Sequence, residues 1–236
     1  MEDQANLLPL YEQVRRSILS GIDAGQYAEG SFLPTEPELM AQYGVSRITL
    51  RRAIGELCAD GRLQRQQGRG TIVMPGKVRQ TLVSLSGFSE TMDGLGRKAG
   101  HRILSRDDNP DAPAIRARLG AGALIRFDRL LEDDGRPMTL ETLWFDPQRF
   151  PDVIAPVARG GSFFAALRDK AGIEPAHAER QIDVGFASAS ERDILAITAA
   201  QPVYRIEKIV TDAEGRPLAL SQLVTPSHLV TYTIKT

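Results

Sequence analysis

The chain has 236 residues, 42% of them hydrophobic and 25% charged, which is enough for two ordinary folded domains and excludes a disordered chain. Its single cysteine, Cys58, excludes an internal disulfide, and its three histidines are too dispersed for a zinc cluster, so we expect no structural metal. The N-terminal segment MEDQANLLPLYEQ lacks the pattern of a signal peptide, and no stretch is apolar enough for a membrane span. We therefore expect a cytoplasmic protein with no membrane partner.

Charge is distributed unevenly along the chain. The formal net charge is −1, but residues 44–79 carry eight basic side chains against two acidic ones. Residues 80–236 carry 19 basic and 21 acidic side chains. A compact basic segment joined to a nearly neutral remainder is typical of a protein in which one part contacts an anionic polymer. A solvated basic face would give the same count, so the local pattern has to decide between the two.

The first eighty residues predict three helices. Apolar residues recur at every fourth position over 10–22, which indicates an amphipathic helix. Residues 35–38 match a capping box that begins a short second helix, and Gly44 ends it. Ser46 can cap a third helix that stops at Asp60-Gly61. A helix, a tight glycine turn and another helix together predict a helix-turn-helix.

The polar side of the third predicted helix is suited to reading DNA. Its first two turns, which a recognition helix inserts into the major groove, carry cationic and polar side chains. After this helix, residues 63–73 predict a hairpin with a glycine-rich tip, which is a wing. We expect the DNA-binding residues to be Ser46, Arg47, Thr49, Arg51, Arg52, Arg65, Gln67, Gly68 and Arg69.

The segment from PLYEQVRR to QGRGTIV, residues 9–73, resembles the winged-helix domain of the GntR family of bacterial transcriptional regulators. The resemblance implies that Ser46, Arg47, Thr49 and Arg51 on the recognition helix, with Gln67 and Gly68 at the wing tip, lie at the DNA. One departure is visible. Many members have Ser-Glu-Arg at the start of the second helix, whereas this chain has Thr35-Glu36-Pro37 and so lacks an arginine that often contacts the operator.

A second domain is predicted beyond a linker. We expect a DNA-binding domain over 1–75, a linker over 76–83 and the second domain over 84–236. Residues 128–147 and 207–226 each contain an apolar strand, an acidic turn, the triplet Gly-Arg-Pro and another strand. Two such hairpins, separated by helical segments, predict an α+β domain built from two similar halves around a central antiparallel sheet.

Three short helices are predicted in the second domain. They span 88–95, with Ser86 as a possible cap, 163–170 after Ser162, and 191–197 after a capping box at Ser188. This layout resembles the UTRA effector-binding domain of the HutC subfamily, whose fold is similar to chorismate lyase. The resemblance implies a transcription factor that senses a small molecule. The positions that match the family's effector site are Ser86, Phe88, Ser89, Arg129, Glu141 and Ser162.

The predicted effector site has one feature that the residues themselves support. Arg129 and Glu141 are equally far from the turn at Gly135, so they should face each other across the hairpin and bind either a polar ligand or each other. The site also departs from sensors of phosphorylated sugars, which commonly carry an arginine where this chain has Leu131 and end in a different C-terminal motif. We therefore expect an anionic effector, and a carboxylate is at least as well supported as a sugar phosphate.

These observations predict a transcriptional repressor whose affinity for operator DNA is controlled by a small-molecule metabolite. The resemblance implies a homodimer on a palindromic operator. The alternative is a chorismate lyase-like enzyme domain fused to a DNA-binding module. The sequence contains no nucleophile elbow, phosphate loop or metal motif, so we expect no catalytic residues, no cofactor and no enzyme activity.

Overall fold

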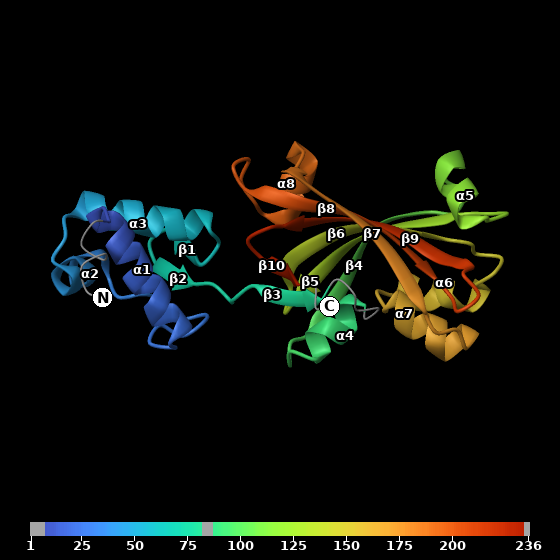
Figure 1. Ribbon diagram of the computed structural model, residues 1–236, viewed down its shortest axis with the longest axis horizontal. Coiled ribbons are helices and arrows are strands. Elements are labelled where there is room, and N and C mark those ends of the chain that lie inside the picture. Colours follow the sequence, from blue (N-terminus) through green and yellow to red (C-terminus); the bar gives the residue numbers. More distant parts are fainter. Residues whose placement is uncertain (1–7, 82–86, 234–236) are drawn as a thin grey trace. The chain divides into compact units, whose positions relative to one another are not determined.

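The computed structural model describes residues 8–81 and 87–233 of the chain. These residues divide into two compact units, Met1–Val78 and Arg79–Thr236. Figure 1 colours the units along the sequence, with the N-terminal unit in blue. The segment expected as a linker, 76–83, contains strand β3 (Val78–Thr81), which pairs with β10 (Val230–Thr233).

The three predicted helices of the N-terminal unit are confirmed. They are α1 (Leu10–Asp23), α2 (Glu36–Tyr43) and α3 (Arg47–Ala59). At the start of α2, the Thr35 backbone N–H and hydroxyl both donate to Glu38 Oε2 at 2.8 Å. Gly44 ends this helix with φ 63°, a left-handed conformation that favours glycine. These local signals turn the chain sharply between α2 and α3.

The wing is an antiparallel hairpin of β1 (Leu63–Gln66) and β2 (Gly70–Val73), with Leu63 opposite Val73. Phe32 forms an isolated bridge with Ile72 that extends this small sheet. Beneath the wing lies one apolar core, which fixes the wing and the helices as one body. Its buried members are Val14, Ile18, Ile22, Tyr27, Leu33, Leu39, Leu50, Ala53, Ile54, Leu57, Leu63 and Val73.

One member of the predicted stripe on α1 lies outside this core. Leu10 is 60% exposed, whereas Val14, Ile18 and Ile22 are buried. Leu10 stands in the first turn of α1, before the part of the helix that contributes to the core. The four-residue periodicity therefore identified the helix correctly but overestimated by one turn how much of it is buried.

A six-stranded antiparallel sheet forms the centre of the second unit, in the order β4-β5-β6-β9-β8-β7. The strands are β4 (Ala99–Asp107), β5 (Ile125–Asp133), β6 (Arg136–Phe145), β7 (His177–Phe186), β8 (Pro202–Thr211) and β9 (Pro217–Pro226). The α+β class predicted from the sequence is confirmed, and both predicted hairpins are present as β5–β6 and β8–β9.

The sheet consists of two similar halves. Each half runs strand, helix and hairpin: β4, α5 (Pro113–Leu119), β5 and β6, then β7, α8 (Ala189–Leu195), β8 and β9. The hairpin turns contain Gly135 with φ 79° and Gly215 with φ 78°. Each hairpin also has a register shift at the same place, between Leu131 and Glu132 and between Val210 and Thr211. The halves meet where β6 pairs with β9.

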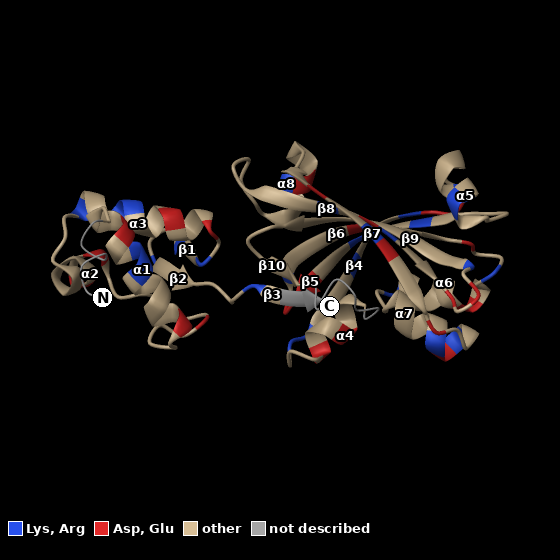
Figure 2. Cartoon of the chain, viewed as in Figure 1, with Lys and Arg blue, Asp and Glu red and all other residues tan. Residues whose placement is uncertain are grey.

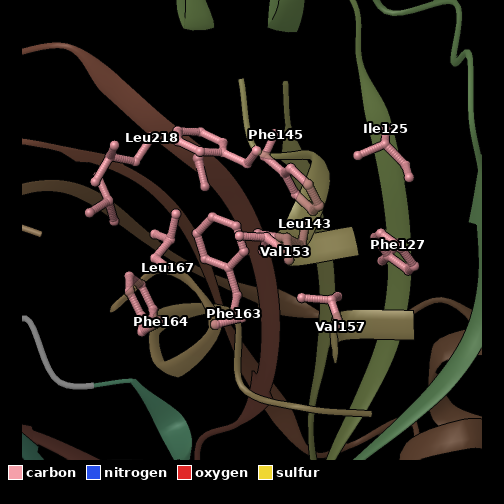
Figure 3. Close-up of a cluster of buried hydrophobic side chains, with 14 residues drawn as sticks. Ile125, Phe127, Leu143, Phe145, Val153, Val157, Phe163, Phe164, Leu167 and Leu218 are labelled. Carbon is pink, nitrogen blue, oxygen red and sulfur yellow. The ribbon is translucent and has the colours of Figure 1, made fainter. Parts of the chain in front are cut away.

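Helices lie on both faces of this sheet (Figure 1). One face packs against α6 (Pro151–Ala158) and α7 (Phe163–Ala166), which continues as a π-helical turn over Leu167–Ala171, and lies near α4 (Phe88–Asp93). We call this the helix-covered face. Figure 3 shows its core, where Phe163 packs against Phe145 at 5.1 Å between ring centroids. On the opposite face, α5 packs against β9, and a small apolar cluster there contains Trp144 of β6 and Leu220 of β9.

The sequence predicted some of these helices and missed others. Ser162 and Ser188 cap α7 and α8, as expected. Gly87, rather than Ser86, is the N-cap of α4, and Ser86 lies outside the described residues. Helices α5 and α6 were not predicted, because both are short. Within the described ranges, no helix has the length and apolar character to cross a bilayer.

Gly160 should be hard to replace, since it joins α6 to α7 where the loop touches β4. It has φ 79°, and a Cβ there would lie 2.4 Å from the carbonyl oxygen of His101. Gly172 has φ 64° but open space around it, so a substitution there measures the cost of backbone strain alone. We expect Gly172→Ala to cost about 1–2 kcal/mol and Gly160→Ala about 2–3 kcal/mol more in urea unfolding. Equal losses of unfolding free energy in the two variants would show that the loop at Gly160 moves away from His101 without an energetic cost.

Candidate DNA-binding and effector sites

The opening of α3 presents its polar side chains to solvent. Ser46 is the N-cap, and its Oγ accepts from the Thr49 backbone N–H at 3.3 Å. Arg47 and Arg51 are exposed, and so is Ile48, at 84% of its surface. An exposed apolar side chain next to these arginines is suited to contact the methyl group of thymine. Sequence reasoning did not select Ile48.

The other arginines of this region differ in how the protein holds them. Arg51 lies 3.5 Å from Glu36, an exposed pair that water screens. The guanidinium of Arg52 stacks 3.6 Å above the ring of Tyr11, so α1 orients it. Arg65 donates to the backbone carbonyl of Arg51 at 3.2 Å and so ties the wing to the recognition helix.

The wing tip is open on its outer side. Gln67, Gly68 and Arg69 are exposed, and Gly68 has φ 73°. The guanidinium carbon of Arg69 lies 5.4 Å from the ring centroid of Phe32. In Figure 2, the basic positions of this unit are coloured on α1, on α3 and near β1. The N-terminal unit thus brings all the predicted DNA-binding residues onto one helix and one hairpin.

In the second unit, Arg129 and Glu141 form a buried ion pair. They are opposite each other in the β5–β6 register, as the sequence predicted, and are 3% and 6% exposed. Arg129 donates through Nε to Glu141 Oε2 at 3.0 Å and through Nη2 to the same oxygen. Of the two alternatives, the structure shows the pair bound to each other. Breaking a buried pair leaves a charge without compensation, so this contact has a structural role.

The residues around Arg129 connect it to three other elements. Its Nη1 lies 3.4 Å from His101 Nδ1 on β4 and 3.4 Å from the carbonyl oxygen of Gly161. His101 Nε2 is within 2.8 Å of the Ser89 hydroxyl on α4, and its ring packs edge-on to Phe88. Burial and the charge of Arg129 lower the pKa of His101 to about 4, so its ring is neutral near pH 7. Sequence reasoning found Phe88 and Ser89 but missed His101.

The structure adds Lys208 and Ser221 to this cluster. Lys208 is half-buried, its Nζ lies 4.8 Å from the ring centroid of Phe164, and it stands opposite Ser221 in the β8–β9 register. Burial alone would raise the pKa of Glu141, but Arg129, Lys208 and the Ser221 hydroxyl together lower it. The half-repeat was the signal that could have identified both residues, since it aligns them with Arg129 and Glu141.

Further polar residues continue the cluster along the same face. Thr139 and Thr225 are buried, with 2.9 Å between their hydroxyl oxygens. Tyr232, on β10, is hydrogen-bonded to Thr225, and burial raises its pKa to about 12. Ser162 accepts from the Ala165 backbone N–H at 3.3 Å and so caps α7. Buried polar groups are uncommon in a protein interior, so this cluster is a candidate ligand site.

A groove of 760 Å³ lies near α8 on the opposite face of the sheet, and its lining also includes Arg129 and Glu141. The polar groups that line it largely satisfy one another: Thr142 donates to Asp128 at 2.9 Å, and Gln222 donates to Glu207 at 3.0 Å. Asp183 and Glu191 add two more carboxylates to its lining. Five carboxylates line the groove against two arginines, Arg129 and Arg205, so an anionic ligand is better matched to the helix-covered face.

Family comparisons agree with this arrangement of a unit with an exposed basic helix and a unit with a buried polar cluster. Residues 10–73 match the model of the bacterial regulatory proteins of the gntR family, and residues 94–230 match that of the UTRA domain. The chain therefore belongs to the GntR family and carries a UTRA domain. It is a DNA-binding transcriptional regulator that responds to a small-molecule ligand.

Similar proteins cover almost the whole chain. The uncharacterized HTH-type transcriptional regulator YurK of Bacillus subtilis is 32% identical over 99% of this chain and 98% of its own length. A probable fructoselysine utilization operon transcriptional repressor of Escherichia coli is 31% identical over 95% of this chain and 93% of its own. Among solved structures, PhnF from Mycobacterium smegmatis has a TM-score of 0.65 at 26% identity, covering 97% of this chain and 99% of that one.

The buried ion pair predicts non-additive changes in stability. Arg129→Met leaves Glu141 buried without its main partner, so we expect a loss of about 3–5 kcal/mol in the free energy of unfolding. The double variant Arg129→Met/Glu141→Gln removes both charges and should recover about 2 kcal/mol of that loss. Urea unfolding of the wild type, both single variants and the double variant measures the coupling. Strictly additive losses would show that the pair contributes no mutual stabilisation.

Proposed function

We propose that this protein is an effector-responsive repressor that binds a palindromic operator as a homodimer. The single observation that carries the proposal is the combination, in one chain, of an exposed arginine-bearing recognition helix and a buried polar cluster in a UTRA domain. The direction of control is supported by the relatives, since the E. coli relative is described as a transcriptional repressor. A two-fold operator follows from a two-fold protein.

Operator recognition is assigned to the first two turns of α3. Arg47 and Arg51 point into solvent there, and arginine can pair bidentately with guanine in the major groove. Ser46, Thr49 and Arg52 would complete the contacts of this helix. The wing residues Arg65, Gln67, Gly68 and Arg69 would contact the phosphate backbone, which strengthens binding to any sequence.

Effector binding is assigned to the helix-covered face of the second unit. There Arg129, Glu141 and Ser89 surround a neutral His101, and Phe88 and Ser162 lie on the adjoining helices. A buried arginine in this cluster favours an anionic effector. We propose a regulator without catalytic activity, because a pKa of about 4 makes His101 a weak general base near pH 7 and its neighbouring carboxylate is engaged by Arg129.

The recognition helix can be tested with one charge removal. Because Arg47 is exposed at the opening of α3, Arg47→Ala should weaken binding to an operator selected by the protein from random DNA by about 1–3 kcal/mol per subunit. Binding to random duplexes should change less. Arg106→Ala, which removes an exposed arginine of the second unit, is the matched control. Fluorescence anisotropy gives both affinities, and an unchanged operator affinity in a folded Arg47→Ala protein would refute the assignment.

Coupling between the two units can be tested with a panel of carboxylates and sugar phosphates. Ligands that raise the thermal unfolding temperature should also weaken operator binding, because a ligand shifts only an equilibrium between states it distinguishes. The operator should weaken ligand binding by the same factor. Calorimetric titrations with and without operator measure this reciprocity. A ligand that binds the second unit and leaves operator affinity unchanged would argue against an effector role.

A further inference from the structure

The two hairpins of the sheet place charged side chains at equivalent positions. Arg129 pairs in register with Glu141, and Lys208 pairs in register with Ser221. In each hairpin these partners stand on the strand side of the shared register shift, and Glu141 and Ser221 each follow the turn glycine by six residues. Lys208 is therefore the counterpart of Arg129 in the second half of the domain.

The exchange of Glu141 for Ser221 changes the charge balance of the cluster. In the first half, the carboxylate of Glu141 compensates the guanidinium of Arg129. In the second half, the residue opposite Lys208 is an uncharged serine. Glu141 is thus shared between the buried Arg129 and the half-buried Lys208. Burying a cation without full compensation is unfavourable, so this half of the cluster can gain from an added anion.

The pKa of Lys208 agrees with this incomplete compensation of its charge. Burial lowers its pKa to about 8; Glu141 opposes this shift, and Arg180 and Arg129 add to it. Its Nζ is also close enough to the ring of Phe164 for a cation–π contact, which compensates only part of a charge. An ammonium group in this position can donate three hydrogen bonds and is a strong point charge for an anionic oxygen.

We propose that Lys208 is a direct ligand of the effector and binds a carboxylate or phosphate group on the helix-covered face of the sheet. The inference rests on the proposed effector site and extends it into the second half of the domain. It also supplies a second cation to a site in which Leu131 stands where an arginine was expected. The effector then spans the junction of the two halves, with Arg129 and Glu141 binding its polar remainder.

Simple anions provide the probe. Acetate and inorganic phosphate, titrated at constant ionic strength, should each be tested for binding to the full-length wild type by calorimetry and by the shift of its thermal unfolding temperature. For the anion that binds more tightly, Lys208→Met should weaken affinity at least about tenfold, and Lys208→Arg should weaken it less, because the charge is retained. Lys170→Met, which removes an exposed lysine from the turn after α7, is the control and should leave affinity unchanged.

Several outcomes overturn the inference. If neither anion binds the wild type, or if Lys208→Met binds it as tightly as the wild type, Lys208 is not an anion ligand. A merely structural role would instead lower the unfolding temperature of Lys208→Met without anion and preserve the anion-induced shift. We expect the reverse, since Arg129 still compensates Glu141 in the Lys208→Met protein. The proposed function has a separate test. If no ligand of the wider panel releases the wild-type protein from the operator, the proposed function is contradicted, and not this inference alone.

Discussion

The second unit is organised around the cost of burying charge. Arg129 is held away from water at the centre of a β-sheet, and that is tolerable only because Glu141 stands opposite it on the paired strand. The register of the β5–β6 hairpin, set by its turn at Gly135, makes the contact possible. The second hairpin repeats the register but replaces the carboxylate with Ser221. A nearly symmetric scaffold thereby acquires an asymmetric, cation-rich interior.

Much of the fold could be predicted because its signals are local. Capping boxes, Gly44 and the glycine-rich wing tip determined the helix-turn-helix and wing within a few residues of each other, and the repeated Gly-Arg-Pro triplets located the two hairpins. The order of the sheet could not be predicted, because the pairing of β6 with β9 joins segments far apart in sequence. The exposure of Leu10 could not be predicted from the four-residue periodicity either, since only tertiary packing decides which turns of a helix are buried.

The candidate sites divide in the same way. The DNA-binding residues follow one another along a helix and a hairpin, so one contiguous segment contained them. The effector cluster is assembled from distant strands. The sequence found Arg129 and Glu141 through hairpin symmetry, but His101 reaches the cluster only because β4 lies beside β5. Lys208 could have been found by aligning the two halves, whereas the depressed pKa of His101 depends on burial that no motif encodes.

The central claim is that the effector binds at the cation-rich cluster on the helix-covered face of the sheet. A crystal structure with a ligand that releases the operator tests this claim most directly. The account predicts an anionic oxygen of that ligand within hydrogen-bonding distance of both Arg129 and Lys208. A ligand found instead in the groove on the opposite face, among Asp128, Glu207 and Gln222, would contradict it.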